Sequence, residues 1–124
     1  MAHRKDHLDE DVSIISSGVK IDGNLYSEGN VRIDGKINGN VNIDGNLTIG
    51  DSSELRGEVK ARNITMSGKI FGKVVAEEKL KLEAKSVLNG DLTTKFLIVE
   101  EGAFFEGFSK MNNEAPQDYK NEWV

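Results

Sequence analysis

The sequence predicts an all-β protein: a right-handed parallel β-helix (β-solenoid) of about six triangular turns. Three observations support this prediction: glycine recurs at a nearly constant step, apolar and polar residues alternate between the glycines, and the 124-residue chain has 13 Gly, one Pro and no Cys. This much glycine disfavours a mainly helical protein, and so little proline disfavours a disordered one. We therefore expect one small β-domain.

The glycine repeat is a five-residue motif with an apolar residue two positions before a glycine and another two positions after it. Its six glycines, separated by 16, 18, 15, 18 and 17 residues, are Gly23, Gly39, Gly57, Gly72, Gly90 and Gly107. In the sixth copy the last apolar position holds Ser109. Because glycine adopts backbone conformations that cost other residues free energy, each motif predicts a corner between two short strands.

Between these motifs, pairs of apolar residues alternate with polar ones. The pairs are Val31 and Ile33, Leu47 and Ile49, Ile64 and Met66, Leu80 and Leu82, and Leu97 and Val99. A period of two places each pair on one side of a strand. A third inward position follows in some copies, at Ile43, Ala61 and Ala76. One turn of three short strands cannot bury these residues, whereas turns stacked about 4.8 Å apart enclose them.

The uneven step between repeats favours the right-handed form of the helix. A left-handed helix of hexapeptides would need a strict step of 18 residues, whereas the steps here vary from 15 to 18. The longer repeats carry one or two extra residues at one place, within residues 50–54, 83–87 and 100–104. We expect all three insertions to lie at the same corner of the helix.

The residues from about 14 to 111 resemble the bactofilins. The resemblance rests on the sequences GVKIDG at residues 18–23, VRIDG at 31–35 and, most specifically, VEEGAFFEG at 99–107. It implies a right-handed β-helix that polymerises without nucleotide into non-polar filaments, often near the membrane. It also implies a scaffolding role in cell shape, cell-wall synthesis or motility, with a cell-wall enzyme or another scaffolded protein bound through the tails.

A short solenoid has two open ends, and uncapped ends favour self-association. At the C-terminal end, Phe104, Phe105 and Phe108 are three of the five phenylalanines in the chain, and we predict that they form a polymer interface. For the N-terminal end the predicted interface residues are Ile14, Ile15, Val19 and Ile21. The alternative is that these residues only fill the first and last turns of the core.

The sequence favours a structural protein over an enzyme. No catalytic, cofactor-binding or metal-binding residue is predicted, because Cys is absent, no phosphate-binding loop occurs, and the two histidines, His3 and His7, lie in the N-terminal tail. A hexapeptide-type acyltransferase, the main enzymatic alternative, would need a histidine base within the coils. The net charge of −5 disfavours nucleic acid as a partner.

The expected domain organisation is a flexible tail at residues 1–13, the β-helix at 14–109 and a second flexible tail at 110–124. No apolar run could span a membrane, so we expect a cytoplasmic, cytoskeletal location. The resemblance implies a membrane contact through the first tail, with Arg4, Lys5 and Leu8 as candidates, although nearby acidic residues would oppose it. In the second tail, Tyr119 and Trp123 either form a docking peptide or are unstructured.

Overall fold

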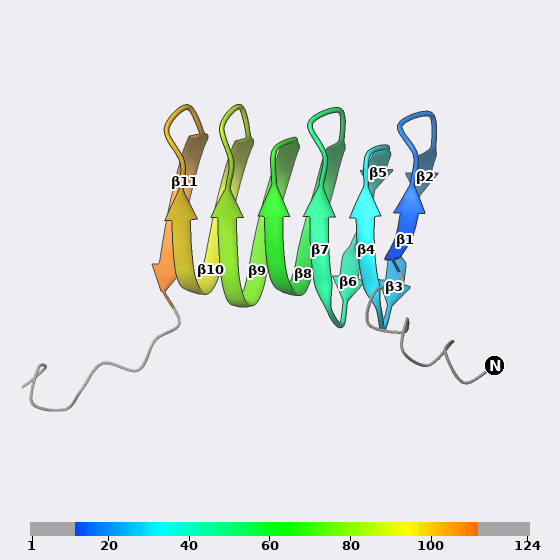
Figure 1. Ribbon diagram of the computed structural model, residues 1–124, viewed down its shortest axis with the longest axis horizontal. Coiled ribbons are helices and arrows are strands. Elements are labelled where there is room, and N and C mark those ends of the chain that lie inside the picture. Colours follow the sequence, from blue (N-terminus) through cyan, green and yellow to red (C-terminus); the bar gives the residue numbers. More distant parts are fainter. Residues whose placement is uncertain (1–11, 112–124) are drawn as a thin grey trace, which may run out of the picture.

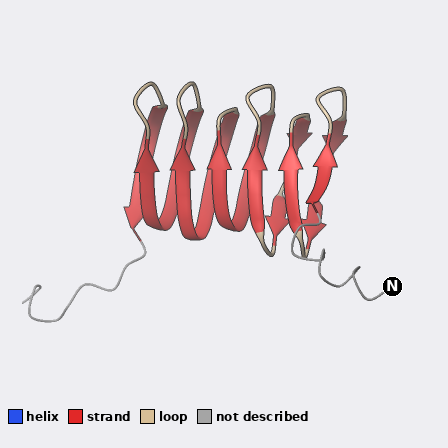
Figure 2. Ribbon diagram, in the orientation of Figure 1, coloured by secondary structure: helices blue, strands red, loops and turns tan. Residues whose placement is uncertain are grey.

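The computed structural model describes residues 12–111, and in these residues the chain forms strands joined by short turns, with no helix (Figure 2). Eleven strands form a single parallel sheet that is wound into a helix. Their bounds are β1 Val12–Ile15, β2 Lys20–Asp22, β3 Leu25–Ser27, β4 Asn30–Ile33, β5 Lys36–Asn38, β6 Val41–Ile43, β7 Asn46–Ile49, β8 Glu54–Met66, β9 Lys69–Leu82, β10 Val87–Val99 and β11 Phe104–Met111.

The winding is right-handed, as predicted. In Figure 1 the strands on the near side run upward, the chain descends on the far side, and successive turns advance from the blue end of the chain to the orange end. The long strands β8, β9 and β10 each bend around corners and so contribute to more than one face. Strand pairing is parallel throughout, which is the arrangement that a solenoid requires.

The pairing registers define three faces, each with six strand segments. Face A consists of β1, β4, β7 and residues 63–66, 79–82 and 96–99. Face B consists of β2, β5 and residues 54–56, 69–71, 87–89 and 104–106. Face C consists of β3, β6 and residues 58–61, 73–76, 91–94 and 108–111. One turn runs through A, B and C, so the described chain makes six turns, numbered 1 to 6 here from the N-terminal end.

The repeating glycines lie at the corner between faces B and C and stack from turn to turn. Gly57 pairs with Gly72, Gly72 with Gly90, and Gly90 with Gly107. All six have positive φ between 137° and 153°. At Gly72 an added Cβ would lie 2.1 Å from the carbonyl oxygen of Gly57. Both the backbone conformation and the close stacking therefore require glycine at this corner.

The predicted insertions lie at the corner between faces A and B, which Figure 1 shows as tall loops beside shorter ones. Four residues connect the faces in turns 1, 3, 5 and 6, and only two do so in turns 2 and 4. In each long loop the fourth residue donates its backbone N–H to the carbonyl of the first, as Ser53 does to Gly50 at 3.1 Å. Length variation is thus absorbed at one corner without disturbing the register of the faces.

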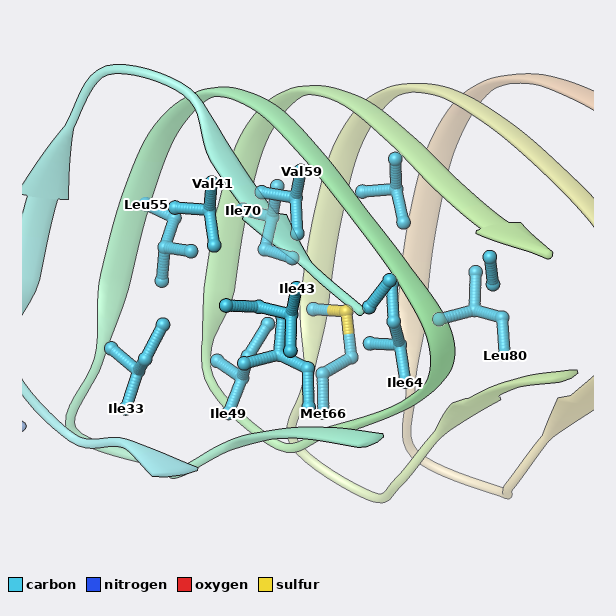
Figure 3. Packing of buried hydrophobic residues seen from close by; sticks show 14 of the residues in the cluster. Ile33, Val41, Ile43, Ile49, Leu55, Val59, Ile64, Met66, Ile70 and Leu80 are labelled. Atoms are coloured by element: carbon cyan, nitrogen blue, oxygen red, sulfur yellow. The ribbon is translucent and has the colours of Figure 1, made fainter. Parts of the chain in front are cut away.

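The interior is a column of apolar side chains that point toward the helix axis from all three faces (Figure 3). The predicted inward residues of turns 2 to 5 are almost completely buried, including Ile33, Leu47, Ile64 and Leu80. Ala61 and Ala76 are buried on face C, as expected, and Ile98 points outward. Because each inward residue stacks on its equivalent one turn away, every internal turn buries its core against two neighbours.

Candidate assembly interface

The two ends of the helix are where this regular stacking stops. Among the described residues, β1, β2 and β3 pair only with strands of turn 2, and residues 96–99 together with β11 pair only with turn 5. Each end therefore presents three short strand edges whose backbone groups have no further strand beside them within residues 12–111. Such edges are templates for pairing with another chain.

The C-terminal end also exposes core positions that are buried one turn earlier. Val99 stacks on Leu82, Leu97 on Leu80 and Phe105 on Leu88. The three residues of turn 5 are fully buried, whereas Val99 is 52% exposed and Leu97 and Phe105 are partly exposed. Two further inward positions of this end are occupied by Ser109 and Met111 on face C. Turn 6 is therefore a largely apolar cross-section on which no other part of residues 12–111 is stacked.

The phenylalanines predicted for this end do not all lie in that cross-section. Phe105 packs against the core, as its register with Leu88 requires. Phe104 and Phe108 point outward from faces B and C and are largely exposed, Phe108 to 80%. The repeat indicates that the side chain of Phe108 points outward, because the residue after the motif glycine is polar and outward in the other copies, as at Lys73 and Asp91. Of the three phenylalanines, only Phe105 thus lies in the end surface, and the other two lie on the lateral faces of the helix.

At the N-terminal end, Ile15 and Ile21 stack on Ile33 and Ile37 and are only partly buried. Ile14 is directed outward on face A, in register with Arg32. Val19 ends the first loop and donates its N–H to Ser16 at 3.0 Å. Leu25 occupies the matching inward position on face C, and it is not among the residues predicted from the sequence for this end. Leu97, Val99 and Met111 at the other end were missed in the same way.

Polar side chains reinforce the stack along its corners. Near the B–C corner, Asn24 accepts a hydrogen bond from the N–H of Asn40, and Asn40 accepts one from the N–H of Glu58, at 3.1 and 3.3 Å. On face A the side chain of Asn63 donates to that of Asn46 at 2.9 Å. These contacts run along the axis, so they support the stacking of the turns.

Two carboxylates at the corners, those of Asp34 and Asp44, form local ion pairs. Asp34 accepts two hydrogen bonds from Arg32, at 2.9 and 3.2 Å, and these bonds raise the pKa of the guanidinium. Asp44 pairs with Arg62 at 3.3 Å beside an open depression of about 440 Å³. Within residues 12–111 no three His, Asp or Glu side chains are arranged to hold a metal ion. His3 and His7 lie outside the described residues.

The described part of the chain contains no helix long and apolar enough to cross a membrane. The candidates for a membrane contact, Arg4, Lys5 and Leu8, lie outside the described residues, as do Tyr119 and Trp123. The described residues thus form a short parallel β-helix that has exposed apolar side chains and strand edges at each end. These features define the class of protein as the β-solenoids.

Comparison with known proteins identifies the family within that class. Residues 13–110 match the model of the bactofilins, described as polymer-forming cytoskeletal proteins. The chain therefore belongs to the bactofilin family, as the sequence motifs predicted, and this membership implies self-association.

Individual relatives agree with this assignment. The structure of the cytoskeletal bactofilin BacA, revealed by solid-state NMR, is similar with a TM-score of 0.75 and 31% identity, covering 83% of this chain and 98% of that one. Bactofilin BacO of Myxococcus xanthus is 24% identical over 95 residues, which are 77% of this chain and 75% of BacO. Bactofilin BacP of the same organism is 24% identical over 106 residues, or 86% of this chain, but the match spans only 44% of BacP.

Proposed function

We propose that this protein assembles end to end, without nucleotide, into non-polar filaments. The observation that carries the proposal is the exposure of core positions at the last turn. Val99 and Phe105 continue columns whose preceding members, Leu82 and Leu88, are completely buried. A second copy stacked on this end would bury these side chains and pair the strand edges, both of which favour association. Since the contact is apolar, it requires no nucleotide hydrolysis to form.

Contacts between like ends make a filament without polarity, because each junction then has two-fold symmetry. The C-terminal end has a shape that suits such a junction. On face B the inward residue is the large Phe105, whereas the first inward residue of face C is the small Ser109. A two-fold axis through the corner at Gly107 would place Phe105 of one copy over Ser109 of the other. A bulky and a small residue at one end thus complement each other across the axis.

The cellular role that follows is a cytoplasmic scaffold for cell-shape, cell-wall or motility machinery. In this proposal the protein is not an enzyme, and its partners are other copies of itself, a scaffolded protein bound through the tails, and the inner face of the membrane contacted through Arg4, Lys5 and Leu8. The alternative, a discrete solenoid enzyme of the hexapeptide acyltransferase type, needs a titratable base beside a substrate pocket in the body of the helix. The histidines of this chain, His3 and His7, precede the described helix.

Electron microscopy of the purified full-length protein, with no nucleotide or metal added, tests this function. Six turns at about 4.8 Å give a subunit length of about 29 Å, so we expect filaments with an axial repeat of one or two such lengths. A discrete trimer that forms no filaments over a range of salt concentrations would reject the proposal and favour the solenoid enzyme.

A further inference from the structure

Face A carries an exposed apolar patch at its C-terminal end, and end-to-end stacking does not cover it. Phe96 and Ile98 point outward from turn 6 and are 57% and 42% exposed. The outward positions beneath them, one turn earlier, are Lys79 and Lys81. Side chains on the outer faces of a solenoid remain on its surface when another copy stacks on its end. This patch, defined by Phe96 and Ile98, therefore needs a different partner.

The described chain stops directly beside the patch. Met111, the last residue of β11, is in register with Thr94, and one turn earlier the chain passes from Thr94 through Lys95 to Phe96. The hydroxyl of Thr94 donates a hydrogen bond to the carbonyl of Phe96 at 3.1 Å, which fixes how closely the two residues lie. Residues 112–124 consequently begin at the corner where face A begins.

These thirteen residues have a composition that fits the patch. Tyr119 and Trp123 are the two aromatic residues among them, and Trp123 is followed by Val124. Three acidic residues against one lysine give the segment a net charge of −2. Lys79 forms no ion pair with any described residue, whereas Lys81 lies 3.5 Å from Glu100. Glu77 and Glu78 at the preceding corner restrict the favourable charge to the face itself.

The length of the segment is sufficient for it to reach its own face A. Tyr119 is eight positions beyond Met111 in the sequence, an extended span of up to about 27 Å, whereas the patch begins within a few residues of the exit. A short tether of this kind gives an effective concentration on the order of millimolar, so even a weak contact would be occupied within one chain.

We propose that residues 112–124 dock on face A of their own chain, with Tyr119 and Trp123 packed against Phe96 and Ile98 and the acidic residues near Lys79. The occupied surface is lateral, so docking leaves the strand edges of turn 6 free. Residues 1–11 precede the corresponding outward pair at the other end of face A, Val12 and Ile14, and contain no aromatic residue. Val12 and Ile14 therefore provide a control position for variants of Phe96 and Ile98.

Trp123 is the only tryptophan in the chain, so its fluorescence reports the contact directly. In the full-length protein we expect its emission to be blue-shifted, and its quenching by acrylamide weaker, than in a synthetic peptide of residues 112–124. Ile98→Ser should return both toward the peptide values. Ile14→Ser, a change at the equivalent outward position of turn 1, should leave both unchanged. Wild-type emission equal to that of the peptide, or an equal response to the two serine variants, would overturn the proposal.

A mixing experiment separates docking within a chain from docking on a neighbour. A trace of wild-type protein is assembled with an excess of chains that carry both Trp123→Phe and Ile98→Ser. Docking within the chain predicts that the blue shift persists. Its loss would contradict the proposal and would place the tail on a second copy. Neither result depends on how the ends of the subunits meet.

Discussion

Val99 lies directly on Leu82 in the same core column of face A, yet Leu82 is fully buried and Val99 is 52% exposed. The two residues have the same inward orientation, and they differ in that Leu82 has a turn on each side of it. Val99 is therefore exposed because it lies in the last described turn. Stacking of a second copy on this end would bury it.

Replacing Phe105 by Arg should abolish filaments while leaving a β-rich, folded subunit. A charge at this inward position would have to be desolvated when a second copy stacks on turn 6. The matched control is Phe108→Arg, a change of the same kind in the same strand, where the side chain already points into solvent. We expect electron microscopy to show filaments for the control and none for Phe105→Arg, with similar circular dichroism spectra for both. Long filaments of Phe105→Arg would contradict the assigned interface.

The loss of stability when a glycine is replaced by alanine should depend on the φ angle of the glycine and on the space available for a Cβ atom. Gly72 has positive φ, and an added Cβ would overlap the carbonyl of Gly57. Gly23 has positive φ but open space around it, and Gly29 has neither constraint. Urea unfolding in the non-polymerising Phe105→Arg background should show little change for Gly29→Ala, a loss of about 1–2 kcal/mol for Gly23→Ala and a larger loss for Gly72→Ala. Equal losses in the free energy of unfolding at all three positions would contradict the conclusion that close stacking at the corner requires glycine.

Replacement by alanine should affect stability differently at two serines that occupy equivalent positions in the long loops. Ser53 and Ser86 are both buried, but only the hydroxyl of Ser53 has a partner, the carbonyl of Gly50. Ser53→Ala should lower the free energy of unfolding by about 1 kcal/mol, and Ser86→Ala should leave it unchanged or raise it. Both changes can be measured by urea unfolding in the Phe105→Arg background. A greater loss at Ser86 would show that its hydroxyl forms a bond that the loop geometry does not predict.

Deleting residues 1–11 should release the protein from anionic lipid vesicles in a co-sedimentation assay while leaving filament formation intact. The reason is that the candidate lipid contacts, Arg4, Lys5 and Leu8, would all be lost, whereas the described helix begins at Val12. A matched control replaces only Arg4 and Lys5 by Gln, which should weaken binding and reduce its dependence on salt. Unchanged sedimentation of the deletion variant would exclude a membrane contact through this segment.

The sequence was most informative where a residue type is dictated by the backbone. Only glycine suits the corner at Gly72 and Gly90, so its spacing gave the number of turns, and the period of two identified inward residues such as Ile64. The direction of Phe108 was less apparent, because hydrophobicity suggested a contact whereas the register of the repeat places it outside. Met111 could not be assigned to the end from its local sequence, since its inward position follows from pairing with Thr94.

The most direct test of the central claim, that filaments form through contacts between like ends, is crosslinking with cysteine variants, since the chain has no natural Cys. Asp22 and Glu106 occupy the same outward column of face B at opposite ends of the helix. In filaments treated with a flexible bis-maleimide, Asp22→Cys alone and Glu106→Cys alone should each give covalent dimers, and the double variant a ladder of longer species. If both single variants remained monomeric while the double variant gave the ladder, the subunits would be stacked head to tail and the account would be contradicted.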